Sequence, residues 1–369
     1  MTMTLDGTNG VTFNNTSLQG AAASPYVLKN RIINGDMRID QRNAGALINP
    51  AVSGYTVDRW YYYQSQTSKG TIGQNAGSVT PPVGFSNYLG FTSTSAYSIN
   101  STDQFFIQQY IEGFNFADLG FGSANAKTVT LSFQVYSSLT GTFGGVLQNS
   151  AATRSYPFTY TISTANTWTS VLVTIAGDTT GTWIGATNGT GIKVVFSLGS
   201  GTAQSATAGA WTGTSFITSA TGATSVVAVN GATFYITGVQ LEIGSTATPF
   251  ERRLYNQELA NCQRYYQKFT SLTGNYVAFG SGSISNSTTA VLYLKYATAM
   301  RAAATLTQSN CGLYSGSGPY AITSLQNLRY GSDSMGFEAV VASGLTSGQG
   351  CTILGNNNSS AFIELSAEL

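Results

Sequence analysis

The sequence contains no histidine and little charge of either sign. Without histidine, the chain cannot build a Ser-His-Asp or Cys-His nucleophile system or a histidine-ligated zinc site, and the usual near-neutral general base is missing. Charged residues make up 8% of the chain, against about 25% in an ordinary soluble domain. The formal net charge of +1 gives no basic field for phosphates, so we expect no nucleic-acid partner and no binding to a membrane surface.

Long apolar runs are absent as well. No stretch approaches the roughly 18 consecutive apolar residues that a membrane span needs, so we expect no membrane insertion. The N-terminal sequence MTMTLDGTNGVTF lacks the basic and apolar regions of a signal peptide. These two features predict a protein that is made and folded in a cytoplasm.

Cysteine is sparse, and Cys262, Cys311 and Cys351 lie far apart in the sequence. An odd, scattered set predicts reduced thiols packed in a core, because nothing places the chain in an oxidising compartment. One disulfide with a spare thiol is the alternative.

Glycine, serine, threonine, asparagine and glutamine take the place of the missing charge. The 369 residues include 42 glycines and 7 prolines, and 12% are aromatic. Such a composition is typical of a β-rich chain with many turns, and it is too apolar to be disordered. The length suits two or three domains.

Residues 26–252 show a period of two almost throughout, as half-buried antiparallel strands do. The pattern predicts an antiparallel β-sandwich, a jelly roll of roughly eight to ten strands. After Gly238 the alternation restarts in the other phase, which predicts a bulge there. The clearest alternating runs are Val129–Val135, Tyr156–Ile162, Val171–Ile175 and Ile192–Leu198.

Residues 253–272 are predicted to form one linking helix, because Glu251 to Phe269 contains neither glycine nor proline. Its apolar residues recur in an a/d pattern over about two heptads. Two interpretations compete: the helix lies on its own domain, or identical helices meet in a seam around a symmetry axis. The residues of this possible seam are Tyr255, Leu259, Cys262, Tyr266 and Phe269.

The two ends of the chain differ from each other. Residues 273–369 return to the β pattern and predict a second, smaller β domain. Residues 1–25 are polar and contain one short predicted strand, Gly10–Phe13. They are expected either to fray or to become ordered by docking against another protein.

Aromatic side chains are the candidate sugar contacts. On a strand, Trp60 and Tyr62 share one face, and Tyr61 and Tyr63 share the other. One pair must be core, and the other can form a platform on which a sugar ring stacks. Trp60 and Tyr62 are the candidates on this strand, and Trp183 and Trp211, in Gly- and Thr-rich surroundings, are two further candidates.

The few charges gather near the start of the sandwich. Asp36, Asp40 and Asp58 alternate with arginines and indicate either ion pairs that clamp the sandwich edge or carboxylates around Ca²⁺. We favour the ion pairs and expect no metal and no cofactor. No carboxylate spacing points to glycosidase chemistry, and glycine-rich stretches such as Gly141–Gly145 lack the context of a phosphate loop and are expected to be turns. We therefore predict no catalytic residues.

Several segments together resemble bacteriophage virion proteins of the tail-fibre type. The central block is similar to the jelly rolls of carbohydrate-binding modules, and residues 7–20 are similar to a fibre attachment segment. The segments that carry the resemblance are Asn30–Met37, Tyr55–Trp60, Asn166–Trp168, Ile236–Gly244, Ala247–Arg252, Cys262–Tyr266 and Phe362–Leu369.

The resemblance implies a virion component that is usually a homotrimer. Its N-terminal segment 1–25 would dock to other virion proteins, and its distal β domains would face the host. The family offers no fixed ligand residues to carry over onto this chain. In such a trimer the helix seam would hold three chains in register.

Four functions follow for consideration. The first is a receptor-binding tail fibre that attaches to a host-surface glycan. The second is a head fibre, capsid decoration or tail connector without receptor binding. The third is a depolymerase that cuts surface polysaccharide, against which stand the scarce carboxylates and the absence of histidine. The fourth is a secreted lectin, which the missing signal peptide disfavours.

Overall fold

The computed structural model describes residues 4–6, 10–12, 18–19, 29–271, 274–316 and 318–369. Near the N-terminus, three short strands pair in the order β1 (Thr4–Asp6), β2 (Gly10–Thr12) and β3 (Leu18–Gln19). β2 confirms the strand predicted to begin at Gly10. Phe13 and most of the predicted attachment segment 1–25 lie outside the described residues.

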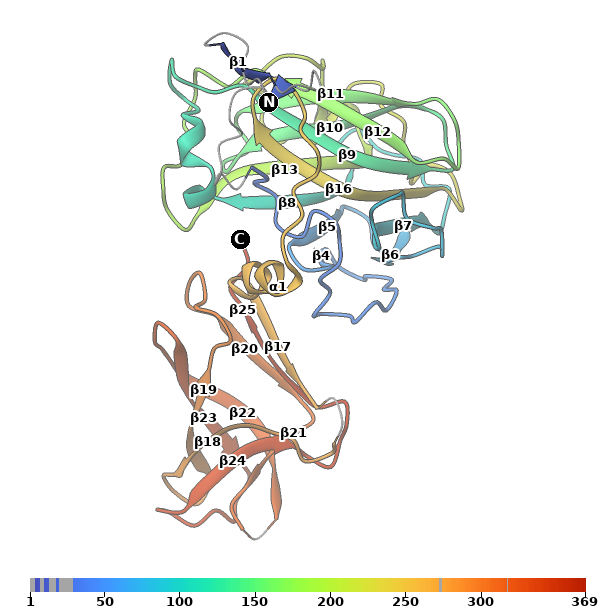
Figure 1. Ribbon diagram of the computed structural model, residues 1–369. Coiled ribbons are helices and arrows are strands. Elements are labelled where there is room, and N and C mark those ends of the chain that lie inside the picture. The colour runs from blue at the N-terminus through green and yellow to red at the C-terminus, as the bar shows by residue number, and fades with distance from the viewer. Residues whose placement is uncertain (1–3, 7–9, 13–17, 20–28, 272–273, 317) are drawn as a thin grey trace.

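Two antiparallel sheets face each other and form a sandwich of the jelly-roll type, as predicted (Figure 1). The six-stranded sheet has the order β11 (Ser155–Ile162), β10 (Gly141–Asn149), β13 (Thr190–Ser200), β8 (Gln104–Glu112), β5 (Trp60–Gln64) and β4 (Gly54–Tyr55). The five-stranded sheet has the order β12 (Thr169–Ile175), β9 (Val129–Ser137), β16 (Thr233–Ile243), β7 (Leu89–Ser93) and β6 (Gly70–Gln74).

Alternation along the strands decides which side chains fill the space between the sheets. In β9, Leu131 and Phe133 point inward and are buried, whereas Ser132 and Gln134 remain partly exposed. Phe133 contacts Phe196 of the opposite sheet, with ring centroids 5.0 Å apart. Burying a large apolar side chain contributes about 1.5–3 kcal/mol, so these inward rows hold the two sheets together.

The predicted bulge at Gly238 is confirmed. The pairing of β16 with β9 shifts register between Thr237 and Gln240. Gly238 has a φ of 62°, and a Cβ atom there would lie 2.6 Å from a ring atom of Phe85. Only glycine fits both the backbone conformation and this close contact.

A covering segment, residues 201–224, lies over part of the outer face of the six-stranded sheet. It contains the short helix η3 (Thr202–Gln204) and the parallel strand pair β14 (Ser205–Ala206) and β15 (Ser219–Ala220). Ile217 of this segment packs in a small buried cluster with Phe106 and Val195 of the sheet. Two further short helices, η1 (Gly113–Asn115) and η2 (Ala117–Leu119), follow β8.

The predicted linking helix is present as α1, which covers Tyr255–Gln263, but the predicted bounds 253–272 are too wide. Residues 266–270 form the strand β17 (Tyr266–Thr270), which pairs with β25 (Phe362–Ser366). The strand forms because these residues exchange backbone hydrogen bonds with a segment far away in sequence, which a local periodicity cannot reveal.

The continuous helical seam is therefore not present within the described residues. Tyr255 and Leu259 lie on the helix, and Tyr255 is exposed. Cys262 is buried, while Tyr266 and Phe269 belong to β17. The stripe is divided between two elements, so it does not form one helical face.

The C-terminal region is a second β domain, as predicted. β17 and β25 form a three-stranded sheet with β20 (Thr305–Ser309). Beside it, six antiparallel strands close on themselves and surround a second apolar core (Figure 1). In their closed order these strands are β18 (Ala278–Ile284), β19 (Thr289–Lys295), β23 (Ser334–Val341), β22 (Pro319–Tyr330), β21 (Cys311–Tyr314) and β24 (Gly350–Gly355).

Buried charges join the C-terminal sheet to the sandwich. The Glu368 carboxylate pairs with Arg42 at 2.7 Å and with Arg59. Arg59 is buried, and its guanidinium carbon lies 3.5 Å from the centroid of the Tyr265 ring. Because a buried arginine needs a counter-charge, this network holds the end of the described chain against the sandwich.

The predicted ion pairs near the start of the sandwich are confirmed only for Asp36, whereas Asp40 accepts backbone hydrogen bonds from Asn43 and Gly45. Arg38 Nε lies 3.2 Å from Asp36. Arg42 and Arg59 pair with Glu368 rather than with the aspartates near them in sequence. Asp58 is buried and accepts hydrogen bonds from Gln41. Burial raises the pKa of Asp58 to about 7. No group of three or more metal-binding side chains is found in the described part of the chain.

All three cysteines are free and buried, which confirms the prediction of reduced thiols in the cores. Burial raises the pKa of Cys262 well above its ordinary value. Among the helices of the described residues, none has the length and hydropathy required to cross a membrane.

Candidate functional site

The predicted platform residues Trp60 and Tyr62 are fully buried, so their assignment as sugar contacts is wrong. Trp60 Nε1 donates a hydrogen bond to the carbonyl of Asn34 at 2.9 Å. The Tyr62 ring lies 5.6 Å from that of Phe91 in the opposite sheet. The predicted alternation along β5 is confirmed, but Trp60 and Tyr62 face the core, while Tyr61 and Tyr63 face outward.

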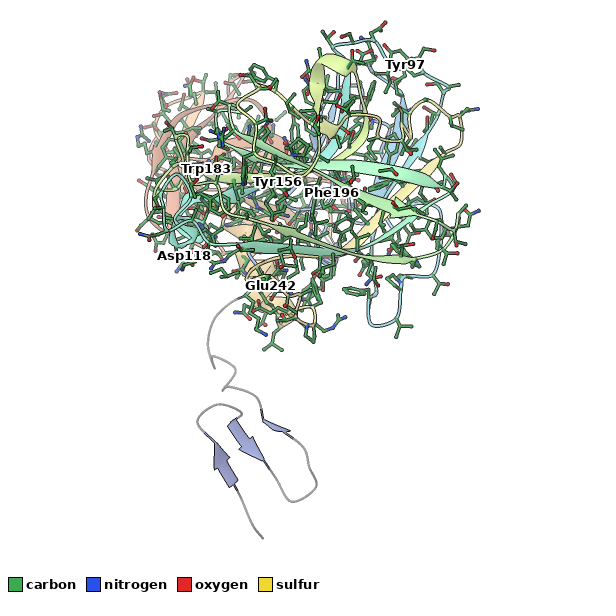
Figure 2. All side chains as sticks on the ribbon, turned by 90° about the horizontal axis from the view of Figure 1, so that it is seen from above. Tyr97, Asp118, Tyr156, Trp183, Phe196 and Glu242 are labelled. Carbon is green, nitrogen blue, oxygen red and sulfur yellow. The ribbon has the colours of Figure 1, made fainter. Side chains whose placement is uncertain are left out.

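The structure brings Trp183 and Trp211 together. Trp183 lies near one end of the sandwich (Figure 2). The two tryptophan rings meet edge to face, with centroids 5.5 Å apart. Trp183 Nε1 donates to Asp178 at 3.2 Å, and Trp211 Nε1 donates to the carbonyl of Ala176 at 2.7 Å. Both rings pack against the main core, so their visible role is to hold the surrounding loops, and a sugar contact there stays a prediction.

A hollow of about 390 Å³ lies on the outer face of the six-stranded sheet. We call it the tyrosine cleft. Tyr61 and Tyr63 of β5 line it, as the outward partners of the two buried aromatic residues. The other lining residues used below are Phe106, Gln108 and Tyr110 of β8, Gln148 of β10, Lys193 of β13, and Phe216 of the covering segment.

Aromatic rings form one wall of the tyrosine cleft. Tyr61 and Tyr110 contact edge to face, with centroids 6.2 Å apart. Tyr63 stacks on Phe106 at 4.8 Å and an interplanar angle of 9°. Phe216, on the opposite rim, is 62% exposed. Ring faces of this kind can cover the apolar face of a sugar while hydroxyls at their edges make hydrogen bonds.

Side-chain amides accompany these rings. Gln108 Nε2 donates to the Tyr110 hydroxyl at 2.6 Å. Gln148 Nε2 donates to the carbonyl of Ile217 at 3.0 Å, which fixes the covering segment to the sheet. Burial raises the pKa of Tyr110 to about 12, so its hydroxyl stays neutral and able to donate at physiological pH. The cleft therefore offers oriented donors and acceptors beside ring faces.

Lys193 is the charged residue among those that line the tyrosine cleft in the described structure. It is partly buried, and its Nζ lies 3.4 Å from Gln148 Oε1 and 5.9 Å from the centroid of the Tyr110 ring. Burial lowers the pKa of this ammonium group. The cleft is thus uncharged apart from one cation.

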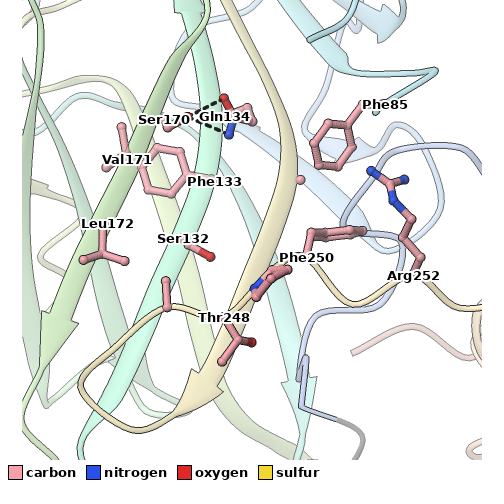
Figure 3. Close-up of a pocket in the computed structure, with 13 residues that line it drawn as sticks. Phe85, Ser132, Phe133, Gln134, Ser170, Val171, Leu172, Thr248, Phe250 and Arg252 are labelled. Atoms are coloured by element: carbon pink, nitrogen blue, oxygen red, sulfur yellow. Dashed lines mark hydrogen bonds between the residues drawn. The ribbon is translucent and has the colours of Figure 1, made fainter. Parts of the chain in front are cut away.

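A second hollow, of about 470 Å³, lies on the outer side of the five-stranded sheet (Figure 3). Gln134 and Ser170 on its floor exchange hydrogen bonds of 2.8 and 3.0 Å. Phe85 and Phe250 meet edge to face at 5.2 Å on its wall, and the guanidinium carbon of Arg252 lies 4.7 Å from the Phe85 centroid. We call this hollow the sheet groove.

Further aromatic residues of the same sheet pack on one another. Tyr136 stacks on Tyr235 at 5.2 Å, and Tyr235 stacks on Tyr88 at 5.0 Å. Trp168 closes the group at 5.5 Å from Tyr136 and donates its Nε1 hydrogen to the carbonyl of Thr80 at 2.8 Å. These rings make their contacts within the protein.

Neither hollow has an aspartate or glutamate among the described residues that line it. A glycosidase needs two carboxyl groups on either side of the scissile bond. The described lining of the two hollows therefore does not contain such a carboxylate pair.

Sequence reasoning missed most of the tyrosine cleft. β8 has the sequence QFFIQQYIE, in which Gln104, Phe106, Gln108 and Tyr110 share one face. A row that mixes amides and aromatic rings on the outer face of a sheet was the signal that could have identified it. Lys193 carried no local signal, because its importance depends on which strands lie beside β13.

Comparisons with known proteins give only distant likenesses. No protein-family model and no curated protein matches the sequence. Among solved structures, the tailspike protein 4 enzymatically active domain of bacteriophage CBA120 matches 61% of this chain and 22% of its own, with 13% identity and a TM-score of 0.32. A CBM4 structure matches 57% of this chain and 98% of its own, with 16% identity and a TM-score of 0.29.

A family 11 carbohydrate-binding module from Clostridium thermocellum, in complex with a β-1,3-1,4-mixed-linked tetrasaccharide, matches 52% of this chain and 91% of its own. Its identity is 9% and its TM-score 0.28. At such identities and TM-scores, the likenesses carry no argument about function.

Proposed function

We propose that this protein is a non-enzymatic fibre component of a bacteriophage virion and that it attaches to a glycan on the host surface through the tyrosine cleft. The observation that carries the binding part is the cleft itself. Ring faces of Tyr61, Tyr63 and Tyr110 stand beside the amides of Gln108 and Gln148. Sugars present both apolar ring faces and hydroxyls, so this combination suits them.

The virion part of the proposal is supported by the sequence. The tail-fibre resemblance of segments such as Asn30–Met37 and Ile236–Gly244 favours a virion protein, and the low charge suits an exposed fibre. A trimer would multiply weak contacts at each cleft, because linked sites raise the effective concentration of the next binding event. The N-terminal segment would join the chain to other virion proteins.

The decisive test is adsorption competition with the purified protein. Host cells are incubated with increasing protein before the parent phage is added, and free phage is counted. Loss of adsorption by the unmodified protein, and its recovery with the Tyr61→Ala/Tyr63→Ala variant, would support the proposal. A matched control is Tyr293→Ala, which removes a 64% exposed tyrosine from the C-terminal domain.

Two outcomes would contradict the proposal. If phage adsorption is unchanged in the presence of the folded protein, and fluorescently labelled protein does not bind the cells, a decoration or connector protein would be favoured. Release of reducing sugar from host polysaccharide would establish a depolymerase and overturn the non-enzymatic assignment.

A further inference from the structure

The tyrosine cleft contains a cation without an anionic partner. No carboxylate forms an ion pair with Lys193 anywhere in residues 29–271, 274–316 or 318–369 (the described body of the chain). Like the other lysines of the described residues, Lys193 forms no ion pair, but it is the lysine that lines the cleft, where it is partly buried. Removing an ammonium group from water is costly unless an anion compensates it.

The strand register fixes the surroundings of this lysine. Lys193 lies directly opposite Tyr110 of β8 on one side and opposite Gln148 of β10 on the other. Directly opposite residues on one face of a sheet have Cβ atoms about 5 Å apart. The ammonium group is therefore held between a ring and an amide oxygen, both of which also line the cleft.

A carboxylate on the same strand as Tyr110 is already used. Glu112 is buried and accepts hydrogen bonds from Arg264 at 2.6 and 2.9 Å and from the Tyr265 hydroxyl at 2.5 Å. Its charge is neutralised at the junction with the C-terminal sheet, so it does not serve Lys193. The ammonium group of Lys193 thus contacts a neutral amide oxygen and a ring, without a carboxylate partner in the described residues.

We propose that the tyrosine cleft selects an acidic saccharide, one whose carboxylate pairs with Lys193 while its ring lies against the tyrosines. The inference rests on the proposed glycan binding and names its ligand class. The ammonium group contributes charge, the Gln148 oxygen orients it, and the rings supply the contact area. A carboxylate of a uronic acid and a phosphate on a sugar share the required negative charge, so the test must separate them.

The test uses the full chain on an array of bacterial surface polysaccharides, each present in native, carboxyl-reduced and dephosphorylated form. The native acidic polysaccharides should bind, carboxyl reduction should abolish binding, and dephosphorylation should leave it unchanged. Binding should also weaken as salt is raised, because partly exposed charges are screened. If dephosphorylation rather than carboxyl reduction abolishes binding, the carboxylate assignment is overturned.

Variants at position 193 tie the selectivity to this side chain. Lys193→Met keeps the apolar stem over the tyrosine ring and should weaken binding of the acidic polysaccharide at least tenfold, with loss of its salt dependence. Lys193→Arg should retain most of the affinity. Lys295→Met, at an exposed lysine of β19, and Arg252→Met, in the sheet groove, are matched controls that should bind as the unmodified protein does.

The outcomes separate the two proposals. Binding of neutral polysaccharide, undiminished in Lys193→Met, would overturn the acidic-ligand inference and leave glycan binding in place. An array on which the folded, unmodified protein binds nothing would overturn both. Each variant should unfold at the same temperature as the unmodified protein, which would show that a loss of binding does not come from a loss of fold.

Discussion

The two outer faces of the sandwich use similar residues for different ends. On the five-stranded sheet, Tyr136, Tyr235 and Trp168 pack on one another, and Gln134 bonds to Ser170. On the six-stranded sheet, the tyrosines and amides border an open cleft, together with an unpaired lysine. The number of aromatic residues on a face therefore does not by itself indicate a binding site. What differs is whether the rings line a hollow: Tyr61, Tyr63 and Tyr110 line the tyrosine cleft, whereas the stacked rings of the five-stranded sheet are not among the residues that line the sheet groove.

The largest effect on glycan binding is expected from removing the cleft tyrosines, and the contrast between the two faces would be wrong if the protein bound glycan without them. Tyr61→Ala/Tyr63→Ala should reduce glycan affinity about a hundredfold, because each lost ring removes about 1–2 kcal/mol of contact and the two losses combine. Isothermal titration calorimetry with the polysaccharide identified on the array measures this. Tyr136→Ala/Trp168→Ala, the same chemistry on the other face, should bind within twofold of the unmodified protein.

The cleft amides should have a smaller effect. Gln108→Ala removes one hydrogen-bonding side chain beside the Tyr110 hydroxyl and should weaken binding about fivefold, as expected for a neutral hydrogen bond of about 1 kcal/mol. Gln134→Ala is the matched change on the five-stranded sheet. If both glutamine variants bind equally well, the cleft is no better equipped with polar contacts than the groove.

The sheet groove should affect stability rather than binding. Gly238→Ala places a Cβ atom against Phe85 and forces a positive φ on alanine. It should lower the free energy of unfolding by about 1–3 kcal/mol, measured by chemical denaturation. Glycan affinity per folded molecule should not change, and a large loss of affinity would move the binding site to this face.

A change of pH should alter the stability of the fold without altering the affinity for glycan. The pKa of Asp58 is raised from 3.8 to about 7 and that of Asp36 is also raised, both chiefly by burial. The folded protein therefore binds more protons than the unfolded chain between about pH 4 and pH 7, so stability should fall as the pH rises through this window, by about 1.4 kcal/mol for each unit of raised pKa.

Asp58→Asn should flatten this decline in a series of thermal unfolding experiments across the window. Glycan affinity should stay level from pH 5 to about 7, since the residues that line the cleft include no carboxylate and no histidine, the groups that ordinarily titrate near this window. An affinity that falls in step with stability would mean that Asp58 and the cleft are coupled.

Periodicity was sufficient to predict the sandwich class and several of its strands. The alternation in Val129–Val135 and the phase change at Gly238 depend on backbone geometry that is local to each strand, and both were found in the structure. The predicted helix over 253–272 failed after Gln263, because Tyr266–Thr270 pairs with residues near the end of the chain. A partner so distant in sequence leaves no mark in a local pattern.

The site was predictable only in part for the same reason. The sequence identified two pairs of aromatic residues on β5 but could not determine which pair the core would take, since Trp60 and Tyr61 are equally suited to burial. Lys193, Tyr110 and Gln148 are brought together by the order of β8, β13 and β10. The strand order is a property of the whole sheet, and it cannot be predicted from single residues.

The attachment of Glu368 has a mechanical consequence. The C-terminal domain is tied to the sandwich covalently through residues 244–265 and also through non-covalent contacts, among them the buried pairing of Glu368 with Arg42 and Arg59 and the hydrogen bond from Lys268 to the Arg42 carbonyl. One tether alone would act as a hinge, about which the two domains could swing. Several attachments around the same junction oppose bending and twisting there, so a force on one domain is passed to the other.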